Sequence, residues 1–387
     1  MKNLLIISSG YPHENERVLS IFVHSQVEEL KKLFDKIVVI STTPYIPKVL
    51  GKWVKPKHRK DSMAEDYSYD NVDVYFTKNI VLPIGILKKY RGDQEYKRSK
   101  EILERIGFKP DIIHSHFSWP SGYAAVKLKR DLNVPVVITI HENHDWFVLE
   151  EKDKRIIETW KNADALIRVN KLDLPTLRKY NNGSVSIPNG YLHNKFKPMD
   201  QNKCKKQLDL EPEKKIIFSL GQIVERKGFQ DLINAANILR KKRTDFQIII
   251  GGNGPYKENL ENLIKKMKLG EYINLIGFVE DKNVPKYMNA AEFFVLPSYS
   301  EGNPTVMFEC LGCGKPFIGT NVGGIPEIII NEDLGMLIEP GDVKRLARAL
   351  ESGMDKDWNK EQLLEYARQF TWKNIVSQVM EIYHEII

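Results

Sequence analysis

Cysteine is scarce in this sequence and long hydrophobic runs are missing. Only three of the 387 residues are cysteine, too few for the disulfide framework of a small secreted protein. No apolar run approaches the ~20 residues that a transmembrane helix needs. The first ten residues hold a short apolar core with no small-residue cleavage site after it, unlike a signal peptide. These absences favour a cytoplasmic protein.

Metal and dinucleotide fingerprints are also missing. Cys310 and Cys313 form a C-x-x-C pair, but no second pair of Cys or His supplies the four ligands of a zinc site. We therefore interpret them as packing residues and expect no metal. The Gly252-Asn253-Gly254 stretch lacks the third glycine of a dinucleotide-binding turn, which disfavours a dehydrogenase.

Positive charge is concentrated in the first half of the chain. Residues 1–190 hold 31 Lys and Arg against 24 Asp and Glu, whereas residues 191–387 hold 27 of each. Six basic residues lie within residues 48–60 with no acid between them. This stretch is either a solvated loop or a contact with an anionic membrane surface. No nucleic-acid-binding motif accompanies the charge, so nucleic acid is not an expected partner.

Short apolar runs alternate with helical patterns along the whole chain, which predicts an α/β fold with parallel sheets. Val23, Val27, Leu30 and Phe34 form an amphipathic stripe between the first two strands, and residues 43–70 are interpreted as an insertion. The predicted strands are residues 4–8, 36–41, 72–77, 111–116, 134–141, 165–169 and 185–187, and then 215–220, 246–251, 273–278, 291–297, 316–320 and 337–338.

The alternation restarts after residue 190, which predicts two doubly wound Rossmann-like domains facing across a cleft. We expect residues 1–190 to form one domain and residues 191–371 the other. Ligands of open α/β sheets bind outside the carboxyl ends of the strands. Residues that directly follow strands are therefore the candidates for function.

The stretch from Pro297 to Glu309 has the features of an anion site. A predicted strand with the apolar composition of a buried strand ends at Ser298, and Pro304 suits the first turn of a helix. Gly302 allows close approach of a ligand to the backbone. The free N–H groups within residues 303–306, among them those of Asn303 and Thr305, would bind an anion at the positive end of the helix.

Two carboxylates flank this predicted anion site. Glu301 precedes the helix and Glu309 lies within it. A carboxylate accepts hydrogen bonds from both hydroxyls of a vicinal diol, as in dinucleotide sites. The arrangement suits a nucleotide-sugar, with a diphosphate between a ribose and a hexose. Taken singly, either acid could also be an ordinary surface residue.

Two further groups of residues follow strands. Arg226 and Lys227 lie in the loop after strand 215–220, where cations would meet a diphosphate. Four histidines follow neighbouring strands of the first half and are expected to gather at one edge of the cleft. They are His114, His116, His141 and His144, with Asp145 next to the last.

Five motifs in order along the chain resemble the retaining, nucleotide-sugar-dependent glycosyltransferases of family 4, which have the GT-B fold. Besides the E-x7-E pattern of Glu301 and Glu309 and the Arg226-Lys227-Gly228 loop, they are Asp111–His116, Ile187–Gly190 and Val322–Glu327. The resemblance implies transfer of a sugar from a nucleotide-sugar to a hydroxyl acceptor without a metal or other cofactor. It also implies that the last helix, residues 372–387, crosses back onto the first domain.

The resemblance also implies roles for individual residues. Glu309 would bind the ribose and Glu301 the transferred sugar, while Lys227 and the helix start at Thr305 would meet the diphosphate. The loop through Gly277, Phe278 and Val279 would face the base. On the acceptor side it implies His116 beside the reacting sugar, with Gly10, His141, His144 and Asp145 nearby.

The sequence departs from the family pattern at Gln222, where relatives usually have arginine. Lys227 and Arg226 must then supply the positive charge for the leaving group. Relatives often have a glycine where Ile21 stands, so Gly10 alone represents the turn after the first strand. Asp355-Lys356-Asp357 has the spacing of a metal-binding D-x-D, but its late position indicates surface residues.

Two other functions are compatible with these residues. A nucleotide-sugar epimerase of the same architecture would release nucleotide without an acceptor, and a non-catalytic binding protein would hold the donor without turnover. The donor's base and sugar are open, as is the acceptor, with lipid-linked compounds among the candidates. Lipid binding by residues 48–60 would place the protein on the inner face of the cell membrane.

Overall fold

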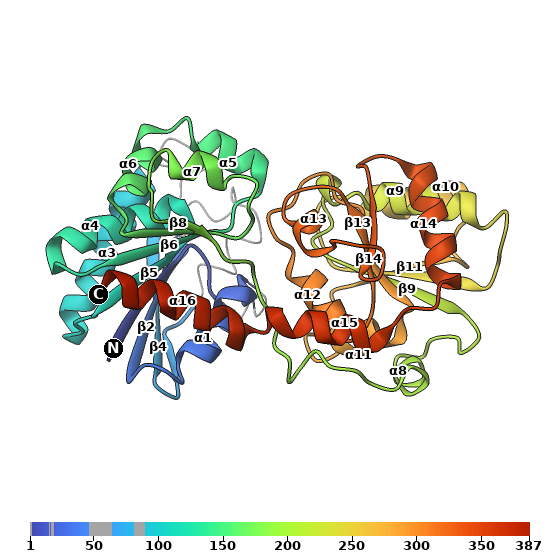
Figure 1. Cartoon of the computed structure of the whole chain (residues 1–387), viewed down its shortest axis with the longest axis horizontal. Helices are drawn as coiled ribbons and strands as arrows, with labels where there is room; N and C mark the ends of the chain where they lie inside the picture. Colours follow the sequence, from blue (N-terminus) through green and yellow to red (C-terminus); the bar gives the residue numbers. More distant parts are fainter. Residues whose placement is uncertain (1, 15, 17–18, 46–63, 81–89) are drawn as a thin grey trace. The chain divides into compact units, whose positions relative to one another are not determined.

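The computed structural model describes residues 2–14, 16, 19–45, 64–80 and 90–387 of the chain. It contains two compact units, one of Met1–Pro188 with Trp372–Ile387 and one of Asn189–Thr371. The division lies two residues before the boundary predicted at residue 190. Each unit is a sheet with helices packed on it (Figure 1). The basic stretch at residues 48–60 lies outside the described residues.

The amino-terminal unit has an eight-stranded sheet in the order β3-β4-β2-β1-β5-β6-β7-β8. All neighbouring strands are parallel except β3 and β4. The strands are β1 (Asn3–Ser8), β2 (Lys36–Tyr45), β3 (Tyr67–Tyr69), β4 (Val72–Ile80), β5 (Ile112–His116), β6 (Val136–Ile140), β7 (Ala165–Arg168) and β8 (Ser184–Ser186). The helices are α1 (Ile21–Leu30), α3 (Arg91–Ile106), η3 (Ser118–Gly122), α4 (Tyr123–Leu132), α5 (His144–Glu150), α6 (Lys154–Asn162), α7 (Leu174–Arg178) and α16 (Trp372–Ile386).

The central strands form as predicted because their apolar runs are buried on both faces of a parallel sheet. Every residue of β5 and β6 is buried. The prediction that residues 43–70 form an insertion is wrong at both ends of this range. Strand β2 continues to Tyr45, and Tyr67–Tyr69 pairs antiparallel with β4 as an edge strand.

Helices α1 and α16 pack against each other in the amino-terminal unit. The predicted stripe of Val23, Val27, Leu30 and Phe34 is buried, although Phe34 lies beyond the last residue of α1. Helix α16 buries one face into the same unit, and the red helix in Figure 1 lies along it. Its buried residues are Trp372, Ile375, Val376, Val379 and Tyr383.

The carboxy-terminal unit has a six-stranded parallel sheet in the order β11-β10-β9-β12-β13-β14. The strands are β9 (Lys215–Leu220), β10 (Phe246–Gly251), β11 (Ile273–Gly277), β12 (Phe293–Leu296), β13 (Phe317–Thr320) and β14 (Gly335–Ile338). The helices are α8 (Gln201–Gln207), η4 (Glu225–Lys227), α9 (Phe229–Leu239), α10 (Lys257–Met267), α11 (Val284–Ala290), α12 (Thr305–Gly312), α13 (Ile325–Ile328), α14 (Val343–Asp355), α15 (Lys360–Ala367) and η5 (Arg368–Phe370).

Alternating side chains of this sheet enter two separate cores. Ile248 and Ile250 of β10 pack on one face, and Ile249 between them packs on the other. Cys310 and Cys313 are fully buried in the second of these cores, where burial raises the pKa of both thiols. Their interpretation as packing residues is confirmed.

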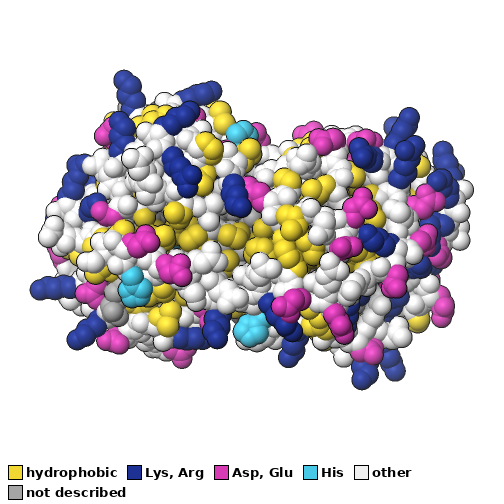
Figure 2. Space-filling view, in the orientation of Figure 1, with side chains coloured by type: hydrophobic (Ala, Val, Ile, Leu, Met, Phe, Trp, Pro, Cys, Tyr) yellow, Lys and Arg dark blue, Asp and Glu magenta, His cyan; other side chains and the backbone are white. Residues whose placement is uncertain are grey.

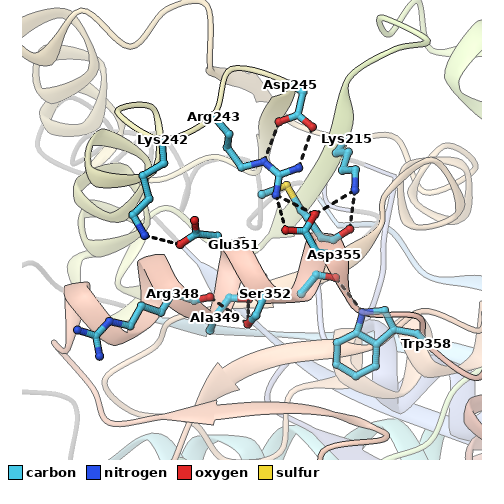
Figure 3. A network of polar contacts seen from close by, with 12 residues as sticks. Lys215, Lys242, Arg243, Asp245, Arg348, Ala349, Glu351, Ser352, Asp355 and Trp358 are labelled. Carbon is cyan, nitrogen blue, oxygen red and sulfur yellow. Dashed lines mark hydrogen bonds and ion pairs between the residues drawn. The ribbon is translucent and has the colours of Figure 1, made fainter.

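Arg243 fastens helix α14 to the loop that follows α9 (Figure 3). Its guanidinium pairs with Asp245 at 2.7 Å and with Asp355 at 3.0 Å, and Lys215 donates to the carbonyl of Met354 at 2.7 Å. Asp355, the first acid of the D-x-D spacing, is thus an ion-pair partner at the end of α14. No helix among the described residues is both long and apolar enough to cross a bilayer.

Candidate functional site

The loop between β12 and α12 contains a buried ion pair. The carboxylate of Glu301 accepts from Nζ of Lys227 at 2.6 Å and from the hydroxyl of Ser298 at 2.6 Å. Both charged side chains are largely buried, with 13% of Lys227 and 7% of Glu301 exposed. The predicted cation and the predicted acid therefore lie together where the helix begins.

Gly228 permits the close packing that brings Lys227 to this loop. Its φ is +70°, and a Cβ atom there would lie 1.8 Å from the carbonyl oxygen of Pro297. Arg226 reinforces the contact, because its carbonyl accepts from the N–H of Tyr299 at 2.8 Å and its Nη1 donates to the carbonyl of Ser300 at 2.9 Å. The side chain of Arg226 thus holds the backbone of the loop while remaining accessible.

A second loop supports Glu301 and Gly302 from the direction of β13. The N–H of Gly324 donates to the carbonyl of Gly302 at 2.7 Å. Gly323 has a φ of +54°, and a Cβ atom there would lie 2.1 Å from the carbonyl oxygen of Glu301. The glycines of the Val322–Glu327 motif are thus required by contact with the backbone of the predicted anion site.

Asn189 and Asn303 hold the other side of the loop. The N–H of Asn189 donates to Oδ1 of Asn303 at 2.9 Å, and Nδ2 of Asn189 donates to the carbonyl of Asn303 at 2.8 Å. Both residues are buried. The Nδ2 donor of Asn303 itself has no partner within the part of the chain that is described, so a buried donor remains unsatisfied beside the helix start.

Helix α12 begins at Thr305 as predicted, but Pro304, predicted for its first turn, precedes it. Pro304 has extended backbone angles at the N-cap position, and Thr305 is the first helical residue. No side chain caps the helix, so the N–H groups at its start lack a side-chain acceptor, although the N–H of Met307 donates to the carbonyl of Pro304 at 3.1 Å. A short uncapped helix start next to Lys227 and Asn303 can bind an anion.

Glu309 lies in the second turn of α12 and is partly buried. Its burial raises the pKa of the carboxyl to about 7, with Lys195 lowering it and Asp281 raising it further. Among the described residues no side chain pairs with this carboxyl group. An acid with a raised pKa and free oxygens is suited to binding hydroxyl groups.

The loop predicted to face the base begins at the end of β11. Gly277 has a φ of +70°, and its carbonyl accepts from the N–H of Gly252 at 2.6 Å. Phe278 is 55% exposed, whereas Val279 packs in the core. Gln222, the expected departure from the family pattern, is exposed after β9.

Three of the four predicted histidines form a stack at the ends of β5 and β6. The ring centroids of His114 and His116 are 4.6 Å apart, and those of His116 and His141 are 5.2 Å apart. Nδ1 of His116 and Nε2 of His141 are hydrogen-bonded at 3.0 Å. Nε2 of His116 and Nδ1 of His141 are buried without a partner among the described residues.

These three imidazoles are neutral near pH 7. Burial lowers the pKa of His114 to about 3. Burial, with His114 nearby, also lowers the pKa values of His116 and His141 well below the ordinary value. His114 is fixed by Tyr383 of α16 at 2.5 Å and by Thr139 at 2.7 Å. His116 and His141 therefore each keep one ring nitrogen without a partner among the described residues.

The expectation that His144 joins this cluster is wrong. His144 is exposed and hydrogen-bonds through Nδ1 to Asp173 at 2.6 Å, because it starts helix α5 rather than continuing β6. Asp145 is exposed in the first turn of α5. Gly10 is buried after β1 and packs near the side chains of Leu19 and Ser20.

Sequence reasoning assigned no role to three residues that build the site. They are Ser298, which donates to Glu301, Thr320, which donates to the carbonyl of Ser298, and Asn189. All three lie within or beside the recognised motifs or directly at strand ends. These positions could have identified them from the sequence. Within the described ranges, no group of three or more His, Cys, Asp or Glu side chains is placed to hold a metal ion.

Two family profiles match nearly the whole chain. The one described as Glycosyltransferase Family 4 matches residues 20–191, and the one described as Glycosyl transferases group 1 matches residues 200–370. A glycosyltransferase of Methanocaldococcus jannaschii is 29% identical over 352 residues, covering 85% of this chain and 92% of that protein. The putative teichuronic acid biosynthesis glycosyltransferase TuaC of Bacillus subtilis is 29% identical over 355 residues, covering 90% and 88%.

Solved structures of low sequence identity share the fold. The sucrose-phosphate synthase of Thermosynechococcus elongatus aligns with a TM-score of 0.80 at 20% identity, covering 100% of this chain and 99% of that one. The Anabaena protein HepE in complex with UDP aligns with a TM-score of 0.74 at 17% identity, covering both chains fully. The chain therefore has the GT-B fold, belongs to the group 1 glycosyltransferases of family 4, and is a glycosyltransferase.

Proposed function

We propose that this enzyme transfers a sugar from a nucleotide-sugar to a hydroxyl acceptor with retention of configuration and without a metal ion. The observation that carries the proposal is the ion pair of Lys227 and Glu301 beside the uncapped start of α12. The ion pair and the helix start together bring a cation, a carboxylate and free N–H groups close to one another. These are the groups that a sugar diphosphate requires.

The carboxy-terminal unit would bind the donor. Lys227 and the first N–H groups of α12, from Thr305 onward, would neutralise the diphosphate, and Nδ2 of Asn303 would donate to it. Glu301 would accept from hydroxyls of the transferred sugar, and Glu309 from the ribose. The backbone at Gly277 and Phe278 would contact the base. Solved structures of HepE contain UDP and UDP-glucose, which favours a uridine nucleotide.

The amino-terminal unit would bind the acceptor and contribute His116. Because His116 is neutral, its free Nε2 can exchange a hydrogen bond with a sugar hydroxyl without adding charge. His141 fixes the ring of His116 through their hydrogen bond. Gly10 would let an acceptor approach the backbone after β1.

The chemical step then needs few protein groups. The bond between the anomeric carbon and the phosphate oxygen breaks, and the acceptor oxygen attacks the anomeric carbon on the same face. The acceptor proton passes to the departing phosphate oxygen. Stabilising the diphosphate charge is the main contribution of the protein, and one such contact is typically worth 10²–10³-fold in rate, ~3–4 kcal/mol.

We propose a cytoplasmic location and an acceptor in cell-surface glycan synthesis, such as a lipid-linked one. The name of the relative TuaC, which refers to teichuronic acid biosynthesis, supports this assignment. A peripheral membrane position would bring the enzyme to such acceptors.

A donor screen followed by product analysis tests the proposal. Thermal unfolding is measured with UDP-, GDP- and ADP-sugars, since a ligand at 100-fold its Kd adds ~2.7 kcal/mol of stability. The stabilising donor is then incubated with candidate acceptors, and NMR reads the anomeric configuration of the product. An α-linked donor should give an α-linked product. An inverted product, a requirement for added metal, or epimerised sugar formed without acceptor would refute it.

A further inference from the structure

Helices α5 and α7 form one exposed surface of the amino-terminal unit. At one end, Nδ1 of His144 is hydrogen-bonded to Asp173, and at the other end the hydroxyl of Tyr180 donates to Glu151 at 3.2 Å. Arg168, fully buried beneath, holds Asp173 through two guanidinium nitrogens and also donates to the carbonyl of Ile140. The two helices are therefore fixed side by side on the sheet.

This α5–α7 surface exposes large apolar side chains. Trp146 is 63% exposed and Leu149 55%, and the two lie three residues apart on the same face of α5. Leu172, next to Asp173, is 53% exposed. Single exposed apolar residues need no explanation, but several on two adjoining elements indicate an interaction site.

Positive charge surrounds these apolar side chains. Five cations are exposed along residues 144–154 and 171–179, against one exposed acid, Asp145. The cations are Lys152, Lys154, Lys171, Arg178 and Lys179. Figure 2 shows hydrophobic side chains next to Lys and Arg over the region of α5 and α7.

Most neighbouring acids do not cancel this charge; the exception is Glu151, which is half-buried and accepts only from the hydroxyl of Tyr180 among the described residues. Asp173 is held by Arg168 and Asp153 by Arg155. Glu150 is largely buried beside Glu142. A partner that meets this surface therefore meets apolar side chains ringed by cations.

We propose that the α5–α7 surface docks on an anionic lipid bilayer, with Trp146 and Leu149 inserted among the headgroups. Tryptophan is favoured at the membrane interface, and basic residues around an inserted apolar face attract anionic lipids. A protein partner is a poorer match, because lysine is depleted at protein interfaces. The proposal does not involve residues 48–60, which lie outside the described residues.

Vesicle sedimentation with the full chain tests this proposal. The protein is mixed with vesicles of phosphatidylcholine alone or with a third of the lipid replaced by phosphatidylglycerol. We expect binding only to the anionic vesicles, weakened by salt. The double variant Trp146→Ser/Leu149→Ser should bind about tenfold more weakly or worse, and Lys152→Glu/Lys179→Glu should lose about fivefold per cation.

The matched control is Leu33→Ser/Ile330→Ser, which removes equally exposed apolar residues elsewhere, one in each unit. It should bind like the wild type. All variants should keep the wild-type unfolding temperature, because the altered side chains are exposed. Equal loss in the control, wild-type binding by Trp146→Ser/Leu149→Ser, or equal binding to neutral vesicles would overturn the proposal.

Tryptophan emission gives a second measurement. The chain has six tryptophans, so the contribution of Trp146 is the difference between the wild type and Trp146→Phe. This difference spectrum should shift to the blue on adding anionic vesicles. An unshifted spectrum, or light scattering that shows Trp146-dependent dimers in place of vesicle binding, would refute membrane docking. Neither measurement uses a donor or acceptor, so failure would leave the proposed transfer reaction unaffected.

Discussion

At the scale of single residues, Lys227 has two functions that an experiment must separate. It neutralises the buried carboxylate of Glu301, and it is proposed to neutralise the donor diphosphate. Lys227→Ala should lower kcat/KM by about 10²–10³-fold. It should also destabilise the fold by ~1–3 kcal/mol, because a buried acceptor loses its charged donor.

The double variant Lys227→Ala/Glu301→Gln separates these effects. Replacing the carboxylate by an amide removes the unpaired charge, so thermal stability should return while kcat/KM stays low. If activity returned together with stability, Lys227 would be only a structural residue. Lys242→Ala, which breaks the surface pair with Glu351, serves as the control and should change neither quantity measurably.

Glu309 should make nucleotide binding depend on pH. Its pKa is raised to about 7 in the protein without ligand, and the ionised form accepts hydrogen bonds from both ribose hydroxyls. Affinity for a nucleoside diphosphate should therefore increase between pH 6 and 8. Titration calorimetry at several pH values, with Glu309→Gln as the comparison, measures this. An equal pH dependence in the variant would exclude Glu309 as its source.

At the scale of elements, Gly228 determines whether the η4–α9 loop can pack against the end of β12. A Cβ atom there would overlap the carbonyl oxygen of Pro297, so Gly228→Ala should displace Lys227 and reduce transfer more than tenfold, in line with the sensitivity of catalysis to small misplacements. Gly270→Ala is the matched control, because nothing lies within 4 Å of its Cβ position. Steady-state kinetics and thermal unfolding of both variants test this requirement for glycine. A fully active Gly228→Ala variant would contradict the requirement.

Helix α16 and strand β5 should together make stability depend on pH. The pKa of His114 is lowered to about 3 by burial, whereas an unfolded histidine has a pKa of about 6.5. The unfolded state binds the extra proton between these values, so stability is complete above pH 6.5 and is lost as the pH falls. The part of this loss that is due to His114 should reach ~2 kcal/mol at pH 5.

Denaturant unfolding between pH 7.5 and 5 measures this dependence. His114→Gln can still bond to Tyr383 and Thr139 but does not titrate, so its slope should be smaller than that of the wild type. Replacement of the exposed His384 by Gln should leave the slope unchanged. Equal slopes for the wild type and His114→Gln would contradict the assignment.

The sequence correctly predicted the helices and strands whose pattern of apolar residues is set by burial. Strands 215–220 and 246–251 have the predicted bounds, because continuous apolar runs are local signals. Strand β3 was missed because it has only three residues. Its pairing with β4 is a tertiary contact that no local pattern reveals.

At the scale of the whole molecule, motif order along the chain predicted the family and the fold, and it selected the residues of the candidate site. Glu301, Lys227 and Asn303 come from segments up to 76 residues apart, yet each lies directly after a strand of the same sheet, where parallel topology brings them together. His144 was misplaced because the helix-start signal of Asn143, whose side chain caps α5 by accepting from the N–H of Trp146, was not used. The links from Asn189 to Asn303 and from Tyr383 to His114 were missed because they join segments more than 100 residues apart.

The proposed mechanism requires that the donor diphosphate binds at the start of α12. Titration calorimetry with UDP, ADP and GDP on the wild type, Lys227→Ala/Glu301→Gln and the control Lys242→Ala tests this most directly. One of the three nucleotides should bind the wild type and the control alike, and the double variant about tenfold or more weakly, since it lacks a charge-assisted contact. Unchanged binding by the double variant would place the diphosphate elsewhere and contradict the account.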